Sequence, residues 1–296
     1  MGNSIVFSND GKYLISVTDE NYIRVREIIE NSVQLCGSYG EHEEQVRALC
    51  FSHSGKILAS GSFDTSVRVW EFENGVLKPK QVLKKHGDTV FCLAFSPDDQ
   101  YLVSGGFDHS VWVWRLSNGE YSPVQELTGH TSWINDVVFH PRGDTFFSCG
   151  SDNMIRVWGL EGDTWTEKQA IKGHASWVNA LAITADGLVL ASGGADCNVR
   201  IWHEREGIWT QHTMLRGYAQ SVNTLAFDKN GRFLVTGSQD SWVSIWQRVG
   251  EDFALEQSLS GGNGQSLFCV RFSPAGDVLV SEGKDRQMRI WRVQQR

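Results

Sequence analysis

Six tryptophans divide most of the chain into segments of nearly equal length. They are each 44 residues apart except for the last, which follows 45 residues after its predecessor: Trp70, Trp114, Trp158, Trp202, Trp246 and Trp291. An aspartate precedes each tryptophan by six positions: Asp64, Asp108, Asp152, Asp196, Asp240 and Asp285. A fixed period of roughly 20–50 residues is the signature of a repeat architecture, so this interval constrains the fold more than any local motif does.

One period contains the pattern of four short strands. Apolar runs rich in β-forming residues occupy 90–95, 101–104, 111–116 and 121–127, and turn residues separate them. Because these runs are nearly continuous, each sheet is expected to be buried on both faces. Four-stranded antiparallel sheets that repeat every 40–45 residues or so and stack around an axis are the blades of a β-propeller.

Several features recur together at fixed offsets in most copies. The phrase GH…V…L-x-F-S-P-x-G…L-A-S-G-S-x-D…V-R-V-W resembles the WD40 repeat family over essentially the whole chain. Six copies end at the tryptophans, and a degenerate seventh comes first, with Arg26 and Glu20 in place of the tryptophan and the aspartate. We therefore predict an all-β, seven-bladed β-propeller of four-stranded blades, the last of which has three strands.

The repeat runs from end to end without a linker, which predicts a single domain over residues 1–296. The expected blades are residues 1–40, 41–84, 85–128, 129–172, 173–216, 217–261 and 262–296.

The resemblance implies a hydrogen-bonded set of histidine, serine or threonine, aspartate and tryptophan inside each blade. Four copies contain all the members: His42, Ser60, Asp64 and Trp70; His86, Ser104, Asp108 and Trp114; His130, Ser148, Asp152 and Trp158; His174, Ser192, Asp196 and Trp202. Tyr218 and Asn263 replace the histidine in the sixth and seventh copies, and the first copy is expected to lack the set. Pairing of this kind lets a blade bury polar groups without leaving any unsatisfied.

Serine, histidine and aspartate also form hydrolase triads, but a catalytic group is needed once and these residues recur in four copies. The sequence contains no P-loop, HExxH or GxSxG motif, and its six cysteines lack the spacing of a zinc site. We therefore expect no enzyme activity, no catalytic residues, no metal and no cofactor.

Charge and hydropathy restrict the class of partner. The 35 acidic residues exceed the 27 basic ones, for a formal charge of −8, which argues against a general nucleic-acid-binding protein. No apolar run approaches the roughly 18–20 residues that span a bilayer, and the N-terminus lacks a signal-peptide pattern. The expected location is cytoplasmic, nuclear or both.

Propellers of this family usually bind through one end, where the loops before the first strand and before the aspartate of each repeat are expected to lie. In the second to fifth copies these positions carry large aromatic residues and an arginine: Arg47, Phe63, Phe91, Phe107, Trp133 and Trp177. Such residues are typical of interface hot spots, so they predict a protein- or peptide-binding face. Alternatively, the rings pack between blades or close the channel mouth. Four further tryptophans are expected to pack within blades: Trp112, Trp165, Trp209 and Trp242.

A three-stranded last blade would have an open edge along residues 287–293. A partner could add a strand there by β-augmentation. Alternatively, Arg286, Arg289 and Arg292 discourage pairing, or the missing strand lies upstream of the given sequence.

The expected function is a non-catalytic scaffold that binds a protein or peptide and helps assemble a multiprotein complex. Two narrower alternatives rest on local resemblance. The phrases at 162–174 and 251–259 are similar to those of the WD40 component of cytosolic iron–sulfur protein assembly. The segment Trp202-His203-Glu204-Arg205 half-matches the Trp-Asp-x-Arg docking signature of ubiquitin-ligase substrate receptors.

Overall fold

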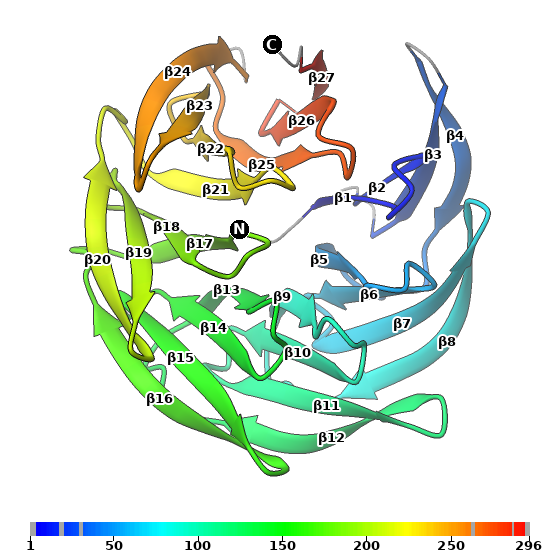
Figure 1. Cartoon of the computed structure of the whole chain (residues 1–296). Coiled ribbons are helices and arrows are strands. Elements are labelled where there is room, and N and C mark those ends of the chain that lie inside the picture. Colours follow the sequence, from blue (N-terminus) through cyan, green and yellow to red (C-terminus); the bar gives the residue numbers. More distant parts are fainter. Residues whose placement is uncertain (1–3, 18–20, 30–31, 262–263, 286, 294–296) are drawn as a thin grey trace.

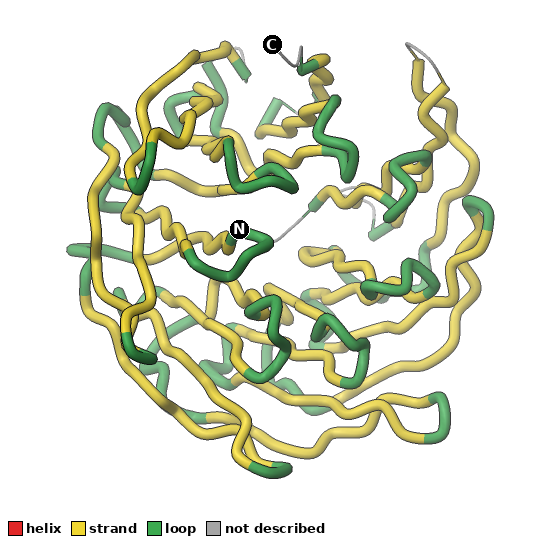
Figure 2. Tube along the Cα trace, viewed as in Figure 1, coloured by secondary structure: helices red, strands yellow, loops and turns green. Residues whose placement is uncertain are grey.

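The computed structural model of the chain describes residues 4–17, 21–29, 32–261, 264–285 and 287–293, which form seven antiparallel sheets. Six sheets have four strands and the last has three, and every sheet is built from strands consecutive in sequence. Figure 1 shows them arranged around a central axis with the first strand of each sheet innermost. The described part of the chain contains strands and loops but no helix (Figure 2), and hence no helix that could cross a membrane. The predicted seven-bladed β-propeller with a three-stranded last blade is confirmed.

Equivalent strands in the seven blades have similar lengths, except that β1 has three residues and the other inner strands have six. The first, inner strands are β1 Ile5–Phe7, β5 Val46–Phe51, β9 Val90–Phe95, β13 Ile134–Phe139, β17 Val178–Ile183, β21 Val222–Phe227 and β25 Leu267–Phe272. The second strands are β2 Tyr13–Val17, β6 Ile57–Ser62, β10 Tyr101–Gly106, β14 Thr145–Gly150, β18 Val189–Gly194, β22 Phe233–Ser238 and β26 Val278–Gly283. The third strands are β3 Ile23–Ile29, β7 Ser66–Glu73, β11 Val111–Ser117, β15 Met154–Glu161, β19 Val199–Arg205, β23 Trp242–Val249 and β27 Met288–Arg292. The outer strands are β4 Ser32–Tyr39, β8 Val76–Lys84, β12 Glu120–Leu127, β16 Thr164–Lys172, β20 Ile208–Leu215 and β24 Asp252–Ser260.

The recurring aspartate builds the turn between the second and third strands. In blade two, Asp64 Oδ1 accepts the backbone N–H of Ser66 at 2.9 Å, two residues further along the chain. The intervening Thr65 has a φ of 66°, in the left-handed region that a β-branched residue rarely adopts. The side-chain hydrogen bond therefore holds a turn that the backbone alone would not favour.

The outer hairpin of each four-stranded blade contains a β-bulge at the same place. In blade five the pairing passes from Ile201 with Thr213 to Trp202 with Gln211, so His212 is the extra residue. The five other four-stranded blades show the same shift directly before the tryptophan or, in blade one, before Arg26. A bulge increases local twist and redirects the side chains beside it, here on the outer rim of the propeller.

The hydrophobic core is divided among the seams between neighbouring blades. Each of the seven clusters of buried side chains draws its members from two adjacent blades. At the seam of blades three and four, Trp158 joins the cluster of Val103 and Val113 from the preceding blade. At the seam that closes the ring, Ile5 and Leu14 of blade one pack with Cys269 and Val280 of blade seven. No described strand is shared between those two blades, and the ring is closed by this packing together with a hydrogen bond from Ser4 Oγ to Glu282 Oε2 at 3.0 Å.

Candidate partner-binding face

A chain of hydrogen bonds joins four side chains inside blade four. Trp158 Nε1 donates to Ser148 Oγ at 2.8 Å, and Ser148 Oγ lies 2.8 Å from His130 Nε2. His130 Nδ1 lies 2.8 Å from Asp152 Oδ2. A neutral histidine with its proton on Nδ1 can donate to the carboxylate and accept from the serine hydroxyl, so each of these polar groups is paired.

Blades two, three and five contain the same arrangement. Their tryptophan–serine distances are 2.8–2.9 Å, serine–histidine 2.7–2.8 Å and histidine–aspartate 2.7–3.0 Å. The sets consist of His42, Ser60, Asp64 and Trp70; His86, Ser104, Asp108 and Trp114; His174, Ser192, Asp196 and Trp202.

Two of the incomplete copies use other residues for part of the same bonding. In blade six the Tyr218 hydroxyl accepts from Trp246 Nε1 at 2.7 Å and lies 2.8 Å from Thr236 Oγ1. In blade one Arg26 Nη1 donates to Ser16 Oγ at 2.6 Å, in the role of the indole. The expectation that blade one lacks the set is therefore wrong in part, because a guanidinium can also donate to the buried hydroxyl. Asn263 and Glu20 lie outside the described residues.

These sets have the distances of a hydrolase triad but not its accessibility. Ser60, Ser104, Ser148 and Ser192 are fully buried, and each hydroxyl oxygen already accepts an indole N–H. A nucleophile must reach its substrate, so these serines act in the structure of the blade. Burial alone would raise the pKa of Asp64, but hydrogen bonds from His42 and Ser66 outweigh it and hold that pKa well below its usual range.

On the propeller end that carries the loops before the inner strands, six side chains from four blades form a continuous row. The Arg47 guanidinium lies 5.4 Å from the ring centres of both Phe63 and Phe91. Phe91 stacks on Phe107 at 4.9 Å, and Phe107 stacks on Trp133 at 4.3 Å with 15° between the planes. Trp133 then contacts Trp177, at 6.3 Å between centroids. We call Arg47, Phe63, Phe91, Phe107, Trp133 and Trp177 the aromatic row.

Backbone hydrogen bonds between two loops of each blade place the row. The residue before the aspartate donates its N–H to the carbonyl of the residue just before the inner strand: Phe63 to Gln45 at 3.0 Å, Phe107 to Thr89 at 2.9 Å, Ser151 to Trp133 at 2.8 Å and Ala195 to Trp177 at 2.8 Å. Both loops are therefore held at the same end of the blade, and equivalent positions in adjacent blades meet across the seam.

The members of the aromatic row differ in exposure. Trp133 and Trp177 are 41% and 51% exposed, whereas Phe91 is only 4% exposed. Arg47, Phe63 and Phe107 are half-buried. The structure thus brings all six residues together. Phe91 is buried within the row, where it packs against Phe107, and has almost no solvent-accessible surface. The two indoles are the part that a partner can reach.

The expectation for the four other tryptophans is correct for two of them and wrong for Trp242. Trp165 and Trp209 are buried at blade seams, with exposures of 1% and 3%, and Trp112 is half-buried. Trp242 is 47% exposed. It opens the third strand at the place where blade two has the small, buried Ser66, and an indole is too large for that space.

Two groups of amide side chains join neighbouring blades, and the sequence analysis predicted neither group. Three asparagines on inner strands donate to backbone carbonyls of the next blade: Asn135 to Val178 at 2.9 Å, Asn179 to Val222 at 3.0 Å and Asn223 to Leu267 at 3.0 Å. Three glutamines on outer strands each bond both the N–H and the carbonyl of a residue in the next blade: Gln81 with Tyr121, Gln125 with Trp165 and Gln169 with Trp209. Their 44-residue spacing is visible in the sequence, but their role requires knowing that blades close into a ring.

The edge strand β27 pairs only with β26 among the described strands. Arg289 on this strand forms an ion pair with Asp285 at 2.6 Å, and Ile290 is 44% exposed. Arg286 lies outside the described residues. β-Augmentation at this edge stays a prediction.

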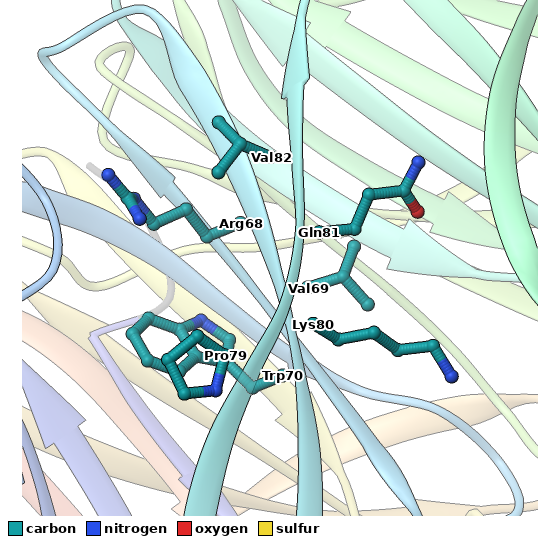
Figure 3. Close-up of a pocket in the computed structure, with 7 residues that line it drawn as sticks. All are labelled: Arg68, Val69, Trp70, Pro79, Lys80, Gln81 and Val82. Carbon is teal, nitrogen blue, oxygen red and sulfur yellow. The ribbon is translucent and has the colours of Figure 1, made fainter.

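A pocket of about 170 Å³ lies over the paired strands β7 and β8 (Figure 3). Figure 3 shows Arg68 and Gln81 pointing to opposite sides of the two strands. The seven lining residues include no carboxylate, thiol, hydroxyl or imidazole: Arg68, Val69, Trp70, Pro79, Lys80, Gln81 and Val82. The amine of Lys80 forms an ion pair with Glu71 at 3.0 Å.

Seven antiparallel sheets, each built from strands consecutive in sequence, form a propeller assembled from repeats, with the aromatic row at one end. The WD domain, G-beta repeat family matches the chain six times, at residues 33–71, 77–115, 121–159, 165–203, 209–247 and 254–292. The chain belongs to the WD40 family. Each match runs from the outer strand of one blade to the third strand of the next, so six matches extend over seven blades. Comparison with curated proteins gives no match.

Proposed function

We propose that this protein is a non-catalytic scaffold that binds a protein or peptide on the aromatic row and helps assemble a multiprotein complex. WD40 propellers are commonly protein-interaction scaffolds, and family membership supports that general role. The observation that carries the proposal for this chain is the continuous row, which ends in two indoles exposed by 41% and 51%.

The stacking supports binding because it orders the site in advance. Phe107 lies flat against Trp133 at 4.3 Å, and Phe91 backs Phe107. A ring that is already held by neighbours loses little side-chain entropy when a partner covers it. Exposed indoles of this kind contribute large contact area and are enriched at hot spots.

Charges beside the row favour a particular partner chemistry. The loops that lead into β5 and β9 carry the exposed acidic residues Glu43, Glu44 and Asp88, and the exposed Lys85 in the second loop lies over the Trp112 ring at 5.6 Å. A segment with an arginine or lysine next to an apolar residue would satisfy both features, since the cation can lie over an indole face while the acidic rim attracts it.

The narrower roles and the cellular location rest on sequence alone. Neither the iron–sulfur assembly role nor the ubiquitin-ligase role gains support from the geometry of the row. Location in the cytoplasm or nucleus is part of the proposal. The edge of β27 is a second candidate surface, where a partner strand would bind by backbone hydrogen bonds.

A peptide-display selection on the purified protein tests the proposal. Selected peptides should bind the wild type and lose about thirtyfold or more in affinity with Trp133→Ala/Trp177→Ala, because hot-spot truncations cost about 2 kcal/mol or more. Trp242→Ala is the matched control, since that indole is 47% exposed and lies outside the row. Thermal melts of all three proteins establish that they are folded.

Equal affinity for the wild type and the folded double variant would refute the proposal for this face. Loss of binding in Trp242→Ala alone would move the site to blade six.

A further inference from the structure

A cluster of potential metal ligands lies on the outer hairpins of blades five and six, outside the aromatic row. His203 on β19 and His212 on β20 belong to blade five, and Glu251 is in the turn before β24 of blade six. One ring nitrogen of each histidine and one carboxylate oxygen all lie within 4.8 Å of one another. The two imidazoles stack with their centroids 4.4 Å apart and 5° between their planes.

Equivalent positions in other blades hold ordinary ion pairs. His203 and His212 stand where blade two has Glu71 and Lys80, whose charged atoms are 3.0 Å apart. His203 and Glu251, 48 residues apart, correspond to an Arg115–Asp163 pair at 3.0 Å across the seam of blades three and four. At these positions, other blades therefore have one ion pair between neighbouring strands and one ion pair between neighbouring blades. In blade five, histidines take the place of the charged residues.

The hydrogen bonding of each imidazole is compatible with metal binding. His203 Nε2 is buried and has no hydrogen-bond partner in the part of the chain that the structure describes. A buried polar atom of this kind calls for an explanation, and a role as a metal ligand is one. His212 Nε2 lies 3.1 Å from Asp252 Oδ1, which leaves its other ring nitrogen available. A carboxylate that orients a histidine in this way is typical of metal sites.

We propose that His203, His212 and Glu251 bind a divalent transition-metal ion at the seam of blades five and six. Two imidazoles and one carboxylate suit Zn²⁺, with water completing a tetrahedral shell.

Binding requires a small local movement. Ligand atoms around a tetrahedral Zn²⁺ lie roughly 3.3 Å apart, since Zn–N bonds are about 2.0–2.1 Å. The atoms of the cluster lie within 4.8 Å of one another, so they must approach by at most about 1.5 Å. Parallel rings cannot direct both in-plane lone pairs at one ion, and therefore one ring must turn about its broad χ2 torsion. His212, the extra residue of the bulge and the less enclosed ring, is the one that can turn.

The neighbouring charges permit this ion. The carboxylates of Glu251 and Asp252 bring negative charge to the two imidazoles. Arg205 and Arg248 are the nearby cations that oppose binding. Arg248 is 3.9 Å from Asp186, which offsets part of its charge.

The site would replace a missing link between blades. Thr213 occupies the position at which Gln81, Gln125 and Gln169 connect their blades to the next. The ion would take ligands from both sides of this seam, so we infer that it joins blades five and six where the glutamine is absent.

Titration of the chelator-treated protein with ZnCl₂, followed by native mass spectrometry and calorimetry, tests the proposal. We expect one ion per chain and a rise in melting temperature with Zn²⁺. His212→Ala and Glu251→Gln should each weaken binding at least tenfold and abolish the rise. His203→Asn should do the same, but the two surface variants decide the result if it fails to fold.

The control is His109→Asn, which removes an exposed histidine elsewhere, at a φ of 69° that asparagine tolerates. Binding unchanged in both His212→Ala and Glu251→Gln would overturn the proposal, as would the absence of binding to the wild type.

Discussion

The recurring tryptophan acts in two directions at once. Within its own blade its N–H donates to a buried serine, as Trp158 does to Ser148. Its ring meanwhile packs against the preceding blade, where Val103 and Val113 belong to the same buried cluster. One residue thus ties the interior of a blade to its seam, which explains why this position recurs with the period of the fold.

We expect Ser148→Ala to lower the free energy of unfolding by about 1–3 kcal/mol, because Trp158 Nε1 and His130 Nε2 both lose a buried partner. Urea denaturation followed by tryptophan fluorescence measures the change. Ser122→Ala, an exposed serine on β12, is the control and should change stability by less than about 0.5 kcal/mol. Equal effects of the two substitutions would show that the buried chain contributes little.

Tyr218 and Arg26 show that the blade requires a bonding pattern rather than particular residues. Tyr218 bridges Thr236 and Trp246 with its hydroxyl, and Arg26 donates to the serine that an indole bonds elsewhere. A repeat can therefore lose its consensus residues and keep buried hydroxyls paired.

At the scale of the strand, the bulge in the outer hairpin positions a glutamine that links one blade to the next. Gln81, Gln125 and Gln169 each follow the extra residue of a bulge, and their side chains reach the outer strand of the next blade. The paired hydrogen bonds to one backbone unit resemble a step of a β-ladder between two sheets that share no strand.

We expect Gln125→Ala to destabilise the fold by about 1–3 kcal/mol, since it leaves the Trp165 N–H and carbonyl without their side-chain partner. Gln257→Ala is a matched control at the same position of blade six, facing a blade described with only three strands. Its effect should be below about 0.5 kcal/mol. Chemical denaturation compares the two, and a loss as large in Gln257→Ala would exclude the proposed role of the link.

At the scale of the whole molecule, the carboxylates of the repeats make the free energy of unfolding depend on pH. Burial opposes ionisation of Asp64, Asp108, Asp152 and Asp196, yet the hydrogen bonds from their histidines and neighbours prevail and lower each pKa. A lowered folded-state pKa stabilises the fold above the unfolded value of about 3.9 and loses that contribution as pH falls. The pKa of Asp136 is shifted in the opposite direction. Burial raises this pKa to about 6, although the backbone N–H groups of Leu181 and Val137 donate hydrogen bonds to this carboxylate.

We therefore expect the free energy of unfolding to change little as pH falls from 7 toward about 5, because proton uptake by Asp136 stabilises the fold while the lowered pKa values of His140 and His203 act in the opposite direction. It should then drop steeply below about pH 4, where the four lowered carboxylates begin to protonate. Urea titrations across this range measure the profile. Asp152→Asn should make the decrease in the free energy of unfolding below about pH 4 less steep. An unchanged slope would contradict the attribution of this decrease to the four aspartates.

Much of the fold follows from the sequence because its determinants are local and repeated. Apolar runs specify strands, the aspartate specifies its turn, and the 44-residue period specifies stacking of like units. The aromatic row was also predictable as a set, since its members occupy equivalent loops. The depth of each member was not: Phe91 is buried, Trp177 is exposed, and Trp242 lies on the surface, contrary to expectation. Exposure depends on what the adjacent blade places beside a residue.

By itself, the sequence determined the architecture, the number of blades and the polar sets that recur within them, because each of these depends on residues inside one period. Only the tertiary structure decided what meets across a seam. The continuity of the aromatic row, the bonds of Gln125 to the next blade and the approach of His212 to Glu251 all depend on the rotation between neighbouring blades. That rotation comes from packing side chains around a closed ring, and no single repeat specifies it.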